Sequence, residues 1–235
     1  MSLRQGGCSA APWQSLNLGV AVGDDTANVA RNRESFTQAL GAMPVWMRQV
    51  HGREVLRLRH DELGRAAQPA DAAWTTEKGL ACTVQVADCL PVLFAARDGS
   101  AVAAAHAGWR GLAAGVLEAT LQAVAEGAGV APADMRVWMG PCIGPRQFEV
   151  GADVLAAFGQ SPQELDAACF VPCPRADGSA AWLADLQLLA RLRLRAAGVT
   201  EISALAACTV EDESRFFSFR RGRVTGRMAA AIWLS

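Results

Sequence analysis

Hydrophobic and polar positions follow two different periods along the chain, and the changes between them divide it into predicted helices and strands. Apolar residues recur at helical spacing over 25–40, where Asp24 or Asp25 can cap the first turn. The same spacing predicts three further helices, over 112–127, 153–158 and 183–197. Strand patterns separate these helices, which is typical of a mixed α/β protein.

Short apolar runs rich in β-branched residues predict the strands. The run over 80–96 has the length of a buried strand, but Asp88 to Pro91 divides it, because proline cannot donate a ladder hydrogen bond. A turn at 97–100 then leads into a strand over 101–108. The polar segment 61–79 predicts an ordered loop. We expect the other strands at 45–52, 54–59, 72–75, 135–140, 202–209 and 227–234.

Length and composition predict one folded domain. The 235 residues are 51% hydrophobic and 19% charged, which is typical of a globular protein. A chain of this length buries roughly 70–75% of its extended surface on folding, so its core needs no disulfide scaffold. No internal repeat, low-complexity tract or shift of composition divides it. We therefore expect a single domain over residues 1–235, of the α/β (α+β) class.

Charge and apolar run length argue against two kinds of partner. The 22 Lys and Arg residues against 23 Asp and Glu leave a net charge of −1, which gives no global attraction to nucleic acid or an anionic membrane. No apolar run approaches the ~18 residues of a membrane span. The seven cysteines are odd in number and widely spaced, which fits a reducing compartment. We expect a cytoplasmic protein without a nucleic-acid or membrane partner.

Three residues of metal-ligating types fall at the ends of predicted strands. His51 lies at the turn between two strands, Cys89 follows Asp88 at the strand break, and His106 ends the strand after the hairpin. Nitrogen, sulfur and nitrogen ligands with an open fourth position are typical of catalytic zinc. Their spacing matches no local zinc motif, so two structural histidines and a core cysteine remain the alternative.

Arginines are the second group of candidates, because a guanidinium binds phosphate through two parallel hydrogen bonds. Arg48 lies three residues before His51, and Arg110 begins a predicted helix whose N-terminal amides also favour anions. Arg220 and Arg221 follow aromatic residues, which predicts a partly buried position for at least one of them. The alternative for each arginine is solvent-exposed charge.

The C-terminal basic cluster also contains Arg223 and Arg227. We expect Arg223 to be exposed. An RNA-binding surface is a weaker interpretation of the cluster, because the cluster is short and the chain has no net positive charge.

Six separated motifs resemble those of a known family. In order they are RQVHG, ADCLPVLF, AAHAGWRG, GPCIGP, CT and FSFRRGRVTGR, and together they span nearly the whole chain. They are similar to the family labelled laccase-domain or polyphenol oxidase proteins, now associated with purine nucleoside phosphorylase activity. One departure is FSFRRG, where the family commonly has a tyrosine before the arginine pair. This chain has no tyrosine, so any role of that phenol is absent.

The resemblance implies an α/β fold of packed mixed sheets flanked by helices, similar to a cysteine-hydrolase-like toxin fold. It implies one zinc held by the residues that match His51, Cys89 and His106. The implied reactions are phosphorolysis of adenosine, inosine, guanosine and methylthioadenosine, and deamination of adenosine.

On this interpretation Cys89 is both a metal ligand and a catalytic residue. Asp88 is the nearest acidic candidate for orienting a ligand or moving a proton. Phosphate is expected to be held by Arg48, Arg110 and one of Arg220 or Arg221.

Two alternatives of other classes stay open. The first is a metal-independent cysteine hydrolase acting on an amide or peptide, with Cys89 or Cys142 as the nucleophile and a histidine as base. The second is a weak copper-dependent polyphenol oxidase, since copper outranks zinc for such ligands and could occupy the site opportunistically. A multicopper centre needs more imidazoles than the three histidines present. The preferred nucleoside and the oligomeric state do not follow from the sequence.

Overall fold

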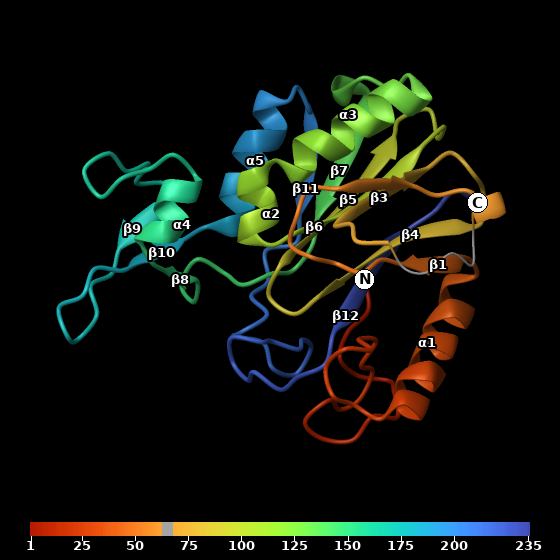
Figure 1. The fold of residues 1–235 in the computed structure, drawn as a ribbon, viewed down its shortest axis with the longest axis horizontal. Coiled ribbons are helices and arrows are strands. Elements are labelled where there is room, and N and C mark those ends of the chain that lie inside the picture. The colour runs from red at the N-terminus through yellow and green to blue at the C-terminus, as the bar shows by residue number, and fades with distance from the viewer. Residues whose placement is uncertain (63–67) are drawn as a thin grey trace.

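The computed structural model describes residues 1–62 and 68–235, and these contain three β-sheets (Figure 1). The largest has six strands in the order β11-β7-β5-β6-β3-β2. Its inner strands pair antiparallel, whereas β2 and β11 pair parallel to their neighbours at the two edges, so the sheet is mixed. The strands are β2 (Val55–Arg57), β3 (Ala72–Thr75), β5 (Leu90–Ala96), β6 (Val102–Ala107), β7 (Met135–Met139) and β11 (Glu201–Ala204).

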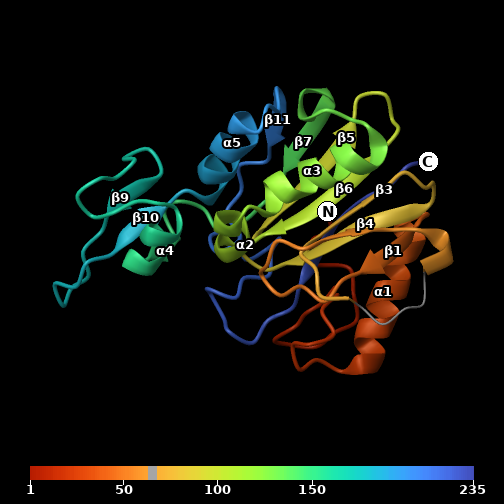
Figure 2. The same ribbon diagram turned by 45° about the horizontal axis from the view of Figure 1, so that its top comes forward.

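Two smaller sheets complete the β-structure. One has the order β1-β4-β12, from β1 (Met43–Trp46), β4 (Leu80–Val86) and β12 (Met228–Ile232). The other comprises β8 (Glu149–Val150), β10 (Trp182–Ala184) and β9 (Phe170–Pro172). Together with α4 (Ala152–Ala157), this last sheet forms a lobe beside the main body, as Figures 1 and 2 show.

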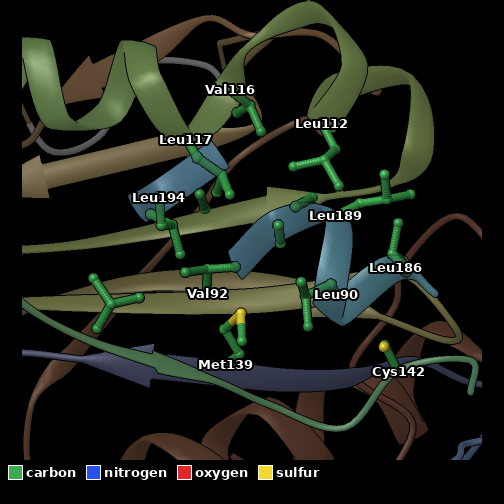
Figure 3. Packing of buried hydrophobic residues seen from close by; sticks show 14 of the residues in the cluster. Leu90, Val92, Leu112, Val116, Leu117, Met139, Cys142, Leu186, Leu189 and Leu194 are labelled. Carbon is green, nitrogen blue, oxygen red and sulfur yellow. The ribbon is translucent and has the colours of Figure 1, made fainter. Parts of the chain in front are cut away.

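The helices α2 (Trp109–Ala114), α3 (Val116–Ala128) and α5 (Leu186–Ala196) cover one face of the six-stranded sheet (Figure 2). In Figure 3, Val92 and Met139 of the sheet face Leu117 and Leu194 of these helices. Burial of these side chains stabilises the layer, at roughly 1.5–3 kcal/mol for each large one. Two short 3-10 helices, η1 (His60–Glu62) and η2 (Pro132–Asp134), lie in connections.

The opposite face of the six-stranded sheet packs on the β1-β4-β12 sheet. Alternate residues of β5 divide between the two cores: Val92 contributes to the helix-covered core, and Leu93 packs against the core between the sheets. This explains why the 90–96 run is apolar at nearly every position, since neighbouring side chains of a strand point to opposite faces. Beyond that second sheet, α1 (Thr26–Leu40) packs its Phe36 against Trp46.

Several element boundaries differ from the sequence-based expectation. The single helix expected over 112–127 is two helices, because Gly115 lies between them at φ 93° in the left-handed region. The helix expected from 183 begins at Leu186, after the Asp185 N-cap, because 182–184 form β10. The strands expected at 45–52 and 54–59 are shorter and lie in different sheets. Part of the loop expected over 61–79 lies outside the described residues.

The expected fold class is confirmed: mixed sheets pack together and helices flank them. Within the described part of the chain, no helix combines the length and apolar character needed to cross a bilayer.

The two larger sheets bring several strand ends to one edge. β1 is parallel to β4, so both end there, and β12 begins there because it is antiparallel to β4. The chain passes from β4 through residues 87–89 directly into β5, whose antiparallel partner β6 ends at the same edge. Loops from distant parts of the sequence therefore meet at this edge.

Candidate metal centre

Three side chains converge where these strand ends meet. His51 lies in the loop after β1, Cys89 immediately precedes β5, and His106 is the penultimate residue of β6. Their ligand atoms all lie within 4.8 Å of one another. Cys89 Sγ is 4.0 Å from His51 Nε2, and the two imidazole centroids are 4.9 Å apart at an interplanar angle of 78°. The structure thus brings together the three residues expected from the sequence to bind a metal.

The loop that carries His51 has a constrained backbone. His51 has a φ of 60°, in the left-handed region that non-glycine residues seldom adopt. The buried Asp71 carboxylate holds this conformation by accepting amide hydrogen bonds from Val50 at 3.1 Å, His51 at 2.9 Å and Gly52 at 2.7 Å. These bonds offset the backbone strain, which costs on the order of 1–3 kcal/mol at such a residue.

Asp71 also orients the second histidine. His106 Nδ1 donates to Asp71 Oδ1 at 2.8 Å, and the His106 amide donates to the Asp71 carbonyl oxygen at 2.7 Å. Because Nδ1 carries the donated proton, Nε2 is the ring nitrogen left to bind a metal. Burial acts to raise the pKa of Asp71, but the hydrogen bonds from His106 and the loop amides lower it below its usual value. Sequence reasoning missed Asp71.

The charges at the centre favour a thiolate. Burial acts to raise the Cys89 pKa, but the attraction of His106 and hydrogen bonds with both histidines outweigh it and lower that pKa to about 6. Burial acts to lower the His106 pKa, but the charges of Cys89 and Asp71 raise it to about 9. The metal-free centre therefore holds a thiolate beside an imidazolium near neutral pH. The thiolate is the form of cysteine that binds metals.

Gly108 leaves space between the three side chains. A Cβ at this position would lie 3.0 Å from His51 Cδ2, 3.1 Å from Cys89 Sγ and 3.7 Å from His106 Cε1. Any side chain at 108 would therefore compete for the space that a metal ion or its fourth ligand needs. Gly111 allows the next turn to approach the His51 loop, because a Cβ there would lie 2.7 Å from the Gly52 carbonyl oxygen.

The donor set and this space fit a catalytic zinc site. Two imidazole nitrogens and one thiolate would give a metal ion three protein ligands and would leave a fourth position for water or a substrate. Among the residues that the structure describes, this is the one group of three or more ligand-type side chains arranged to hold a metal ion.

Asp88 anchors the C-terminal loop to the centre. Its Oδ1 accepts a hydrogen bond from Thr209 Oγ1 at 2.6 Å, and its Oδ2 accepts one from the Arg220 amide at 2.6 Å. Neither oxygen of the Asp88 carboxylate is hydrogen-bonded to His51, Cys89 or His106 in these two interactions. The hydrogen bond to a ligand histidine comes from Asp71 instead, and a proton-transfer role for Asp88 stays a prediction.

The two adjacent C-terminal arginines lie in different environments. The Arg221 guanidinium donates to the carbonyl oxygens of Thr209, Val210 and Phe216 at 2.7–3.0 Å, so it binds the loop together. Arg220 is exposed, and its Nη1 donates to the Glu149 carbonyl oxygen at 3.1 Å. Of the two, Arg220 has more capacity left for a ligand.

The other two expected phosphate ligands are exposed. The Arg110 guanidinium lies 4.2 Å from the centroid of the Trp109 ring, a cation–π contact on the first turn of α2. No side-chain hydrogen bond or ion pair of Arg48 occurs within the described part of the chain.

Cys142 does not suit the nucleophile role considered in the hydrolase alternative. Its side chain is 2% exposed and belongs to the helix-covered core, near Leu186 in Figure 3. Burial raises the Cys142 pKa well above its usual value, so the thiol stays protonated. Cys89 is therefore the better candidate. All seven cysteines lie in the described part of the chain, and none of them forms a disulfide.

Comparisons with known proteins agree over the whole chain. A family model described as multi-copper polyphenol oxidoreductase laccase matches residues 1–235. A Pseudomonas aeruginosa protein named purine nucleoside phosphorylase PA4543 is 47% identical over 234 residues, covering 100% of this chain and 92% of the relative. The Escherichia coli purine nucleoside phosphorylase YfiH is 46% identical over 235 residues, covering 99% of this chain and 92% of the relative.

Among solved structures, the Neisseria meningitidis protein NMB0706 has the same fold, with a TM-score of 0.89 and 45% identity. The match covers 99% of this chain and 92% of that one. These results confirm the family resemblance carried by the six sequence motifs.

Proposed function

The chain belongs to the multi-copper polyphenol oxidoreductase laccase family, and on this basis we propose that it is a zinc-dependent purine nucleoside phosphorylase. Its relatives from Pseudomonas aeruginosa and Escherichia coli are named purine nucleoside phosphorylases. The proposed substrates are inorganic phosphate and adenosine, inosine, guanosine or methylthioadenosine, and adenosine deamination is a second reaction of the same site. The observation that carries the proposal is the convergence of His51, Cys89 and His106.

Zinc is the proposed resident metal because of the donor set, two imidazoles and a thiolate with an open position. Copper outranks zinc in affinity for such ligands, so copper in a preparation would reflect opportunistic occupancy. A multicopper oxidase needs a further copper cluster ligated mainly by imidazoles, and the remaining histidine, His60, contacts the Lys78 carbonyl oxygen at 3.0 Å on the surface. Polyphenol oxidation is therefore the weak alternative.

Phosphorolysis forms a bond between a phosphate oxygen and ribose C1′ and breaks the bond from C1′ to the purine, which keeps the electron pair. When bound, zinc would supply a Lewis acid beside these atoms. Arg48, Arg110 and Arg220 are the proposed phosphate ligands, because their exposed guanidinium groups can form bidentate hydrogen bonds. Asp71 keeps the His106 ring in one orientation, so the site is formed before substrate binds.

A second candidate function has support from one arrangement. The His106 imidazolium lies between the Cys89 thiolate and the Asp71 carboxylate. The same spatial series of nucleophile, base and orienting group occurs in cysteine hydrolases. In that function the Cys89 thiolate would attack an amide carbonyl, the C–N bond would break as the amine takes a proton from His106, and water would then hydrolyse the thioester. A metal bound to the thiolate would inhibit this reaction. The proximity of His51 to the same sulfur favours the metal enzyme, because a hydrolase needs one histidine base.

Chromatography of nucleoside products separates these functions. With phosphate, the zinc-loaded protein is expected to convert adenosine to adenine and ribose 1-phosphate. Without phosphate, it is expected to convert adenosine to inosine and ammonia. Cys89→Ala should abolish both reactions, whereas Cys8→Ala, at an exposed cysteine, should keep them. Release of free ribose would make the protein a nucleoside hydrolase, and no nucleoside turnover would favour the cysteine hydrolase.

A further inference from the structure

Arg227 lies at the same edge as the metal centre, next to the strand that leads to Cys89. It immediately precedes β12, which is antiparallel to β4 with Met228 opposite Val86. This register places Arg227 opposite Ala87, two residues before Cys89, and paired strands are about 4.8 Å apart. Strand pairing thus brings a residue that is 138 positions from Cys89 in the sequence close to the segment that leads to Cys89.

The N-terminal segment fixes the Arg227 backbone. The Arg227 amide donates to the buried Asn17 Oδ1 at 2.8 Å, and its carbonyl oxygen accepts from the Leu18 amide at 3.0 Å. Gly19 packs against the aliphatic stem, because a Cβ there would lie 2.7 Å from Arg227 Cγ. The start of the side chain therefore has little freedom, which lowers the entropy cost of binding through its guanidinium.

The guanidinium has unused donors. Nη1 donates to the carbonyl oxygens of Thr225 at 3.0 Å and Gly226 at 3.1 Å, and the group lies 5.9 Å from the Phe219 ring centroid. Within the described residues, neither Nε nor Nη2 has a hydrogen bond, and no carboxylate pairs with this arginine. Burial lowers the Arg227 pKa, while the charges of Cys89 and Asp88 act in the opposite direction.

This environment differs from that of the other cluster arginines. The Arg221 guanidinium is committed to three loop carbonyls, whereas Arg223 is exposed. Arg227 alone in this group combines partial burial, a fixed backbone and donors without partners in the described structure. A cation that has lost hydration without gaining an acidic partner is suited to binding an anion.

We infer that Arg227 binds the inorganic phosphate substrate through Nε and Nη2, from the β12 side of the metal centre. This inference rests on the proposed phosphorylase function. It adds a ligand to those expected from the sequence, and it gives phosphate a fixed, partly desolvated partner besides the exposed arginines. The same atoms can bind two oxygens of one tetrahedral anion, which is the geometry that an arginine fork provides.

The test compares Arg227→Gln with Arg223→Gln, which removes the same charge from an exposed position of the same loop. Both variants are prepared as zinc-loaded full-length chains, with zinc content measured for each. Arg227→Gln is expected to raise the phosphate KM about 10- to 100-fold, the effect of losing hydrogen bonds to a charged group. The nucleoside KM, zinc content and rate of adenosine deamination should stay near those of Arg223→Gln. Arg227→Lys should give an intermediate phosphate KM, because it keeps the charge but not the fork.

Calorimetric titration with inorganic phosphate separates this inference from the proposed function. If the unmodified protein binds phosphate and Arg227→Gln binds it at least ~10-fold more weakly, the inference holds even if no nucleoside is cleaved. Equal phosphate binding by the Arg227→Gln and Arg223→Gln variants would overturn it. Loss of zinc from Arg227→Gln, with unchanged phosphate affinity in Arg227→Lys, would also overturn it and make Arg227 a structural support of the Cys89 thiolate.

Discussion

Asp71 Oδ1 lies 2.8 Å from His106 Nδ1, and the same carboxylate accepts the three amides of the loop that carries His51. One buried acidic side chain thus positions two of the three residues that converge on the proposed zinc. This carboxylate joins a loop to a strand of the central sheet, so the spacing of the two histidines is determined without the metal.

Replacing Asp71 with asparagine should weaken metal binding. Each Asp71 carboxylate oxygen accepts two of the four hydrogen bonds, so the amino group of an amide would face two donors that it cannot accept from. We expect zinc affinity to fall about 10- to 100-fold, as is typical when a partner of a ligand histidine is changed. Competition with a chromophoric chelator measures the effect, with Asp98→Asn in the exposed β5–β6 turn as the control. Equal affinities in the two variants would exclude this role.

Gly108→Ala should displace the metal while preserving the fold. The added Cβ would lie 3.0 Å from His51 and 3.1 Å from Cys89, where it competes with a bound ion and not with the hydrophobic core. We expect zinc content well below one equivalent and a nearly unchanged melting temperature of the metal-free protein. Gly222→Ala is a matched control, since its nearest neighbour would be 3.9 Å away. Full zinc occupancy in Gly108→Ala would contradict the position assigned to the ion.

The Cys89 thiol of the metal-free protein should titrate near pH 6. Its folded pKa of about 6 lies below the ordinary 9.0, so the stabilisation from the thiolate is present at alkaline pH and is lost as the pH falls through about 6. The His106 pKa is raised from 6.5 to about 9, so the imidazolium contribution is present at acid pH and is lost as the pH rises through about 9. The ion pair therefore exists between these two values.

Alkylation by iodoacetamide at a series of pH values tests this window. Peptide mapping follows Cys89 separately from the exposed Cys8. The alkylation rate should have its midpoint near pH 6, and His106→Asn should move that midpoint upward because the neighbouring cation is lost. A midpoint at the ordinary value in both proteins would show that no such pair forms.

Asp88→Asn should affect stability more than metal binding. The Asp88 carboxylate accepts bonds from Thr209 and the Arg220 amide, and asparagine removes the negative charge that strengthens both and can accept only one of them. Asparagine also tolerates the left-handed φ of 94° at this position, so the substitution isolates the hydrogen bonds. We expect the free energy of unfolding to fall by about 1.5–3 kcal/mol in urea titrations, with zinc stoichiometry retained. Loss of zinc at unchanged stability would assign Asp88 to the metal centre instead.

The residues that converge on the proposed ion could be predicted from the sequence because each lies at a turn or strand end within a recognisable motif. Asp71 could not, although it immediately precedes the predicted strand at 72–75. Its contact with His106 spans 35 residues and depends on the pairing of Ala72 with Ala105, a register that a single sequence does not reveal. The same reason applies to Arg227, whose place opposite Ala87 depends on the register of β12 with β4.

The sequence pattern also predicts only part of the secondary structure. The helix over 26–40 was predicted closely because Asp25 caps it and Gly41 ends it at a φ of 66°. The sheet of β8, β9 and β10 was missed because its strands have two or three residues, too few for a periodic pattern. The break at Gly115 was also missed, since apolar residues continue with helical spacing across it.

The most direct test of the central claim is a zinc titration of the phosphorolysis reaction. The metal-free protein receives increasing amounts of zinc, and ribose 1-phosphate formation from inosine and phosphate is measured at each ratio. The proposed function predicts a rate that rises in proportion to zinc and reaches a plateau at about one equivalent, with Cys89→Ala inactive throughout. A rate that is independent of zinc, or no ribose 1-phosphate at full zinc occupancy, would contradict the assignment of a zinc-dependent phosphorylase.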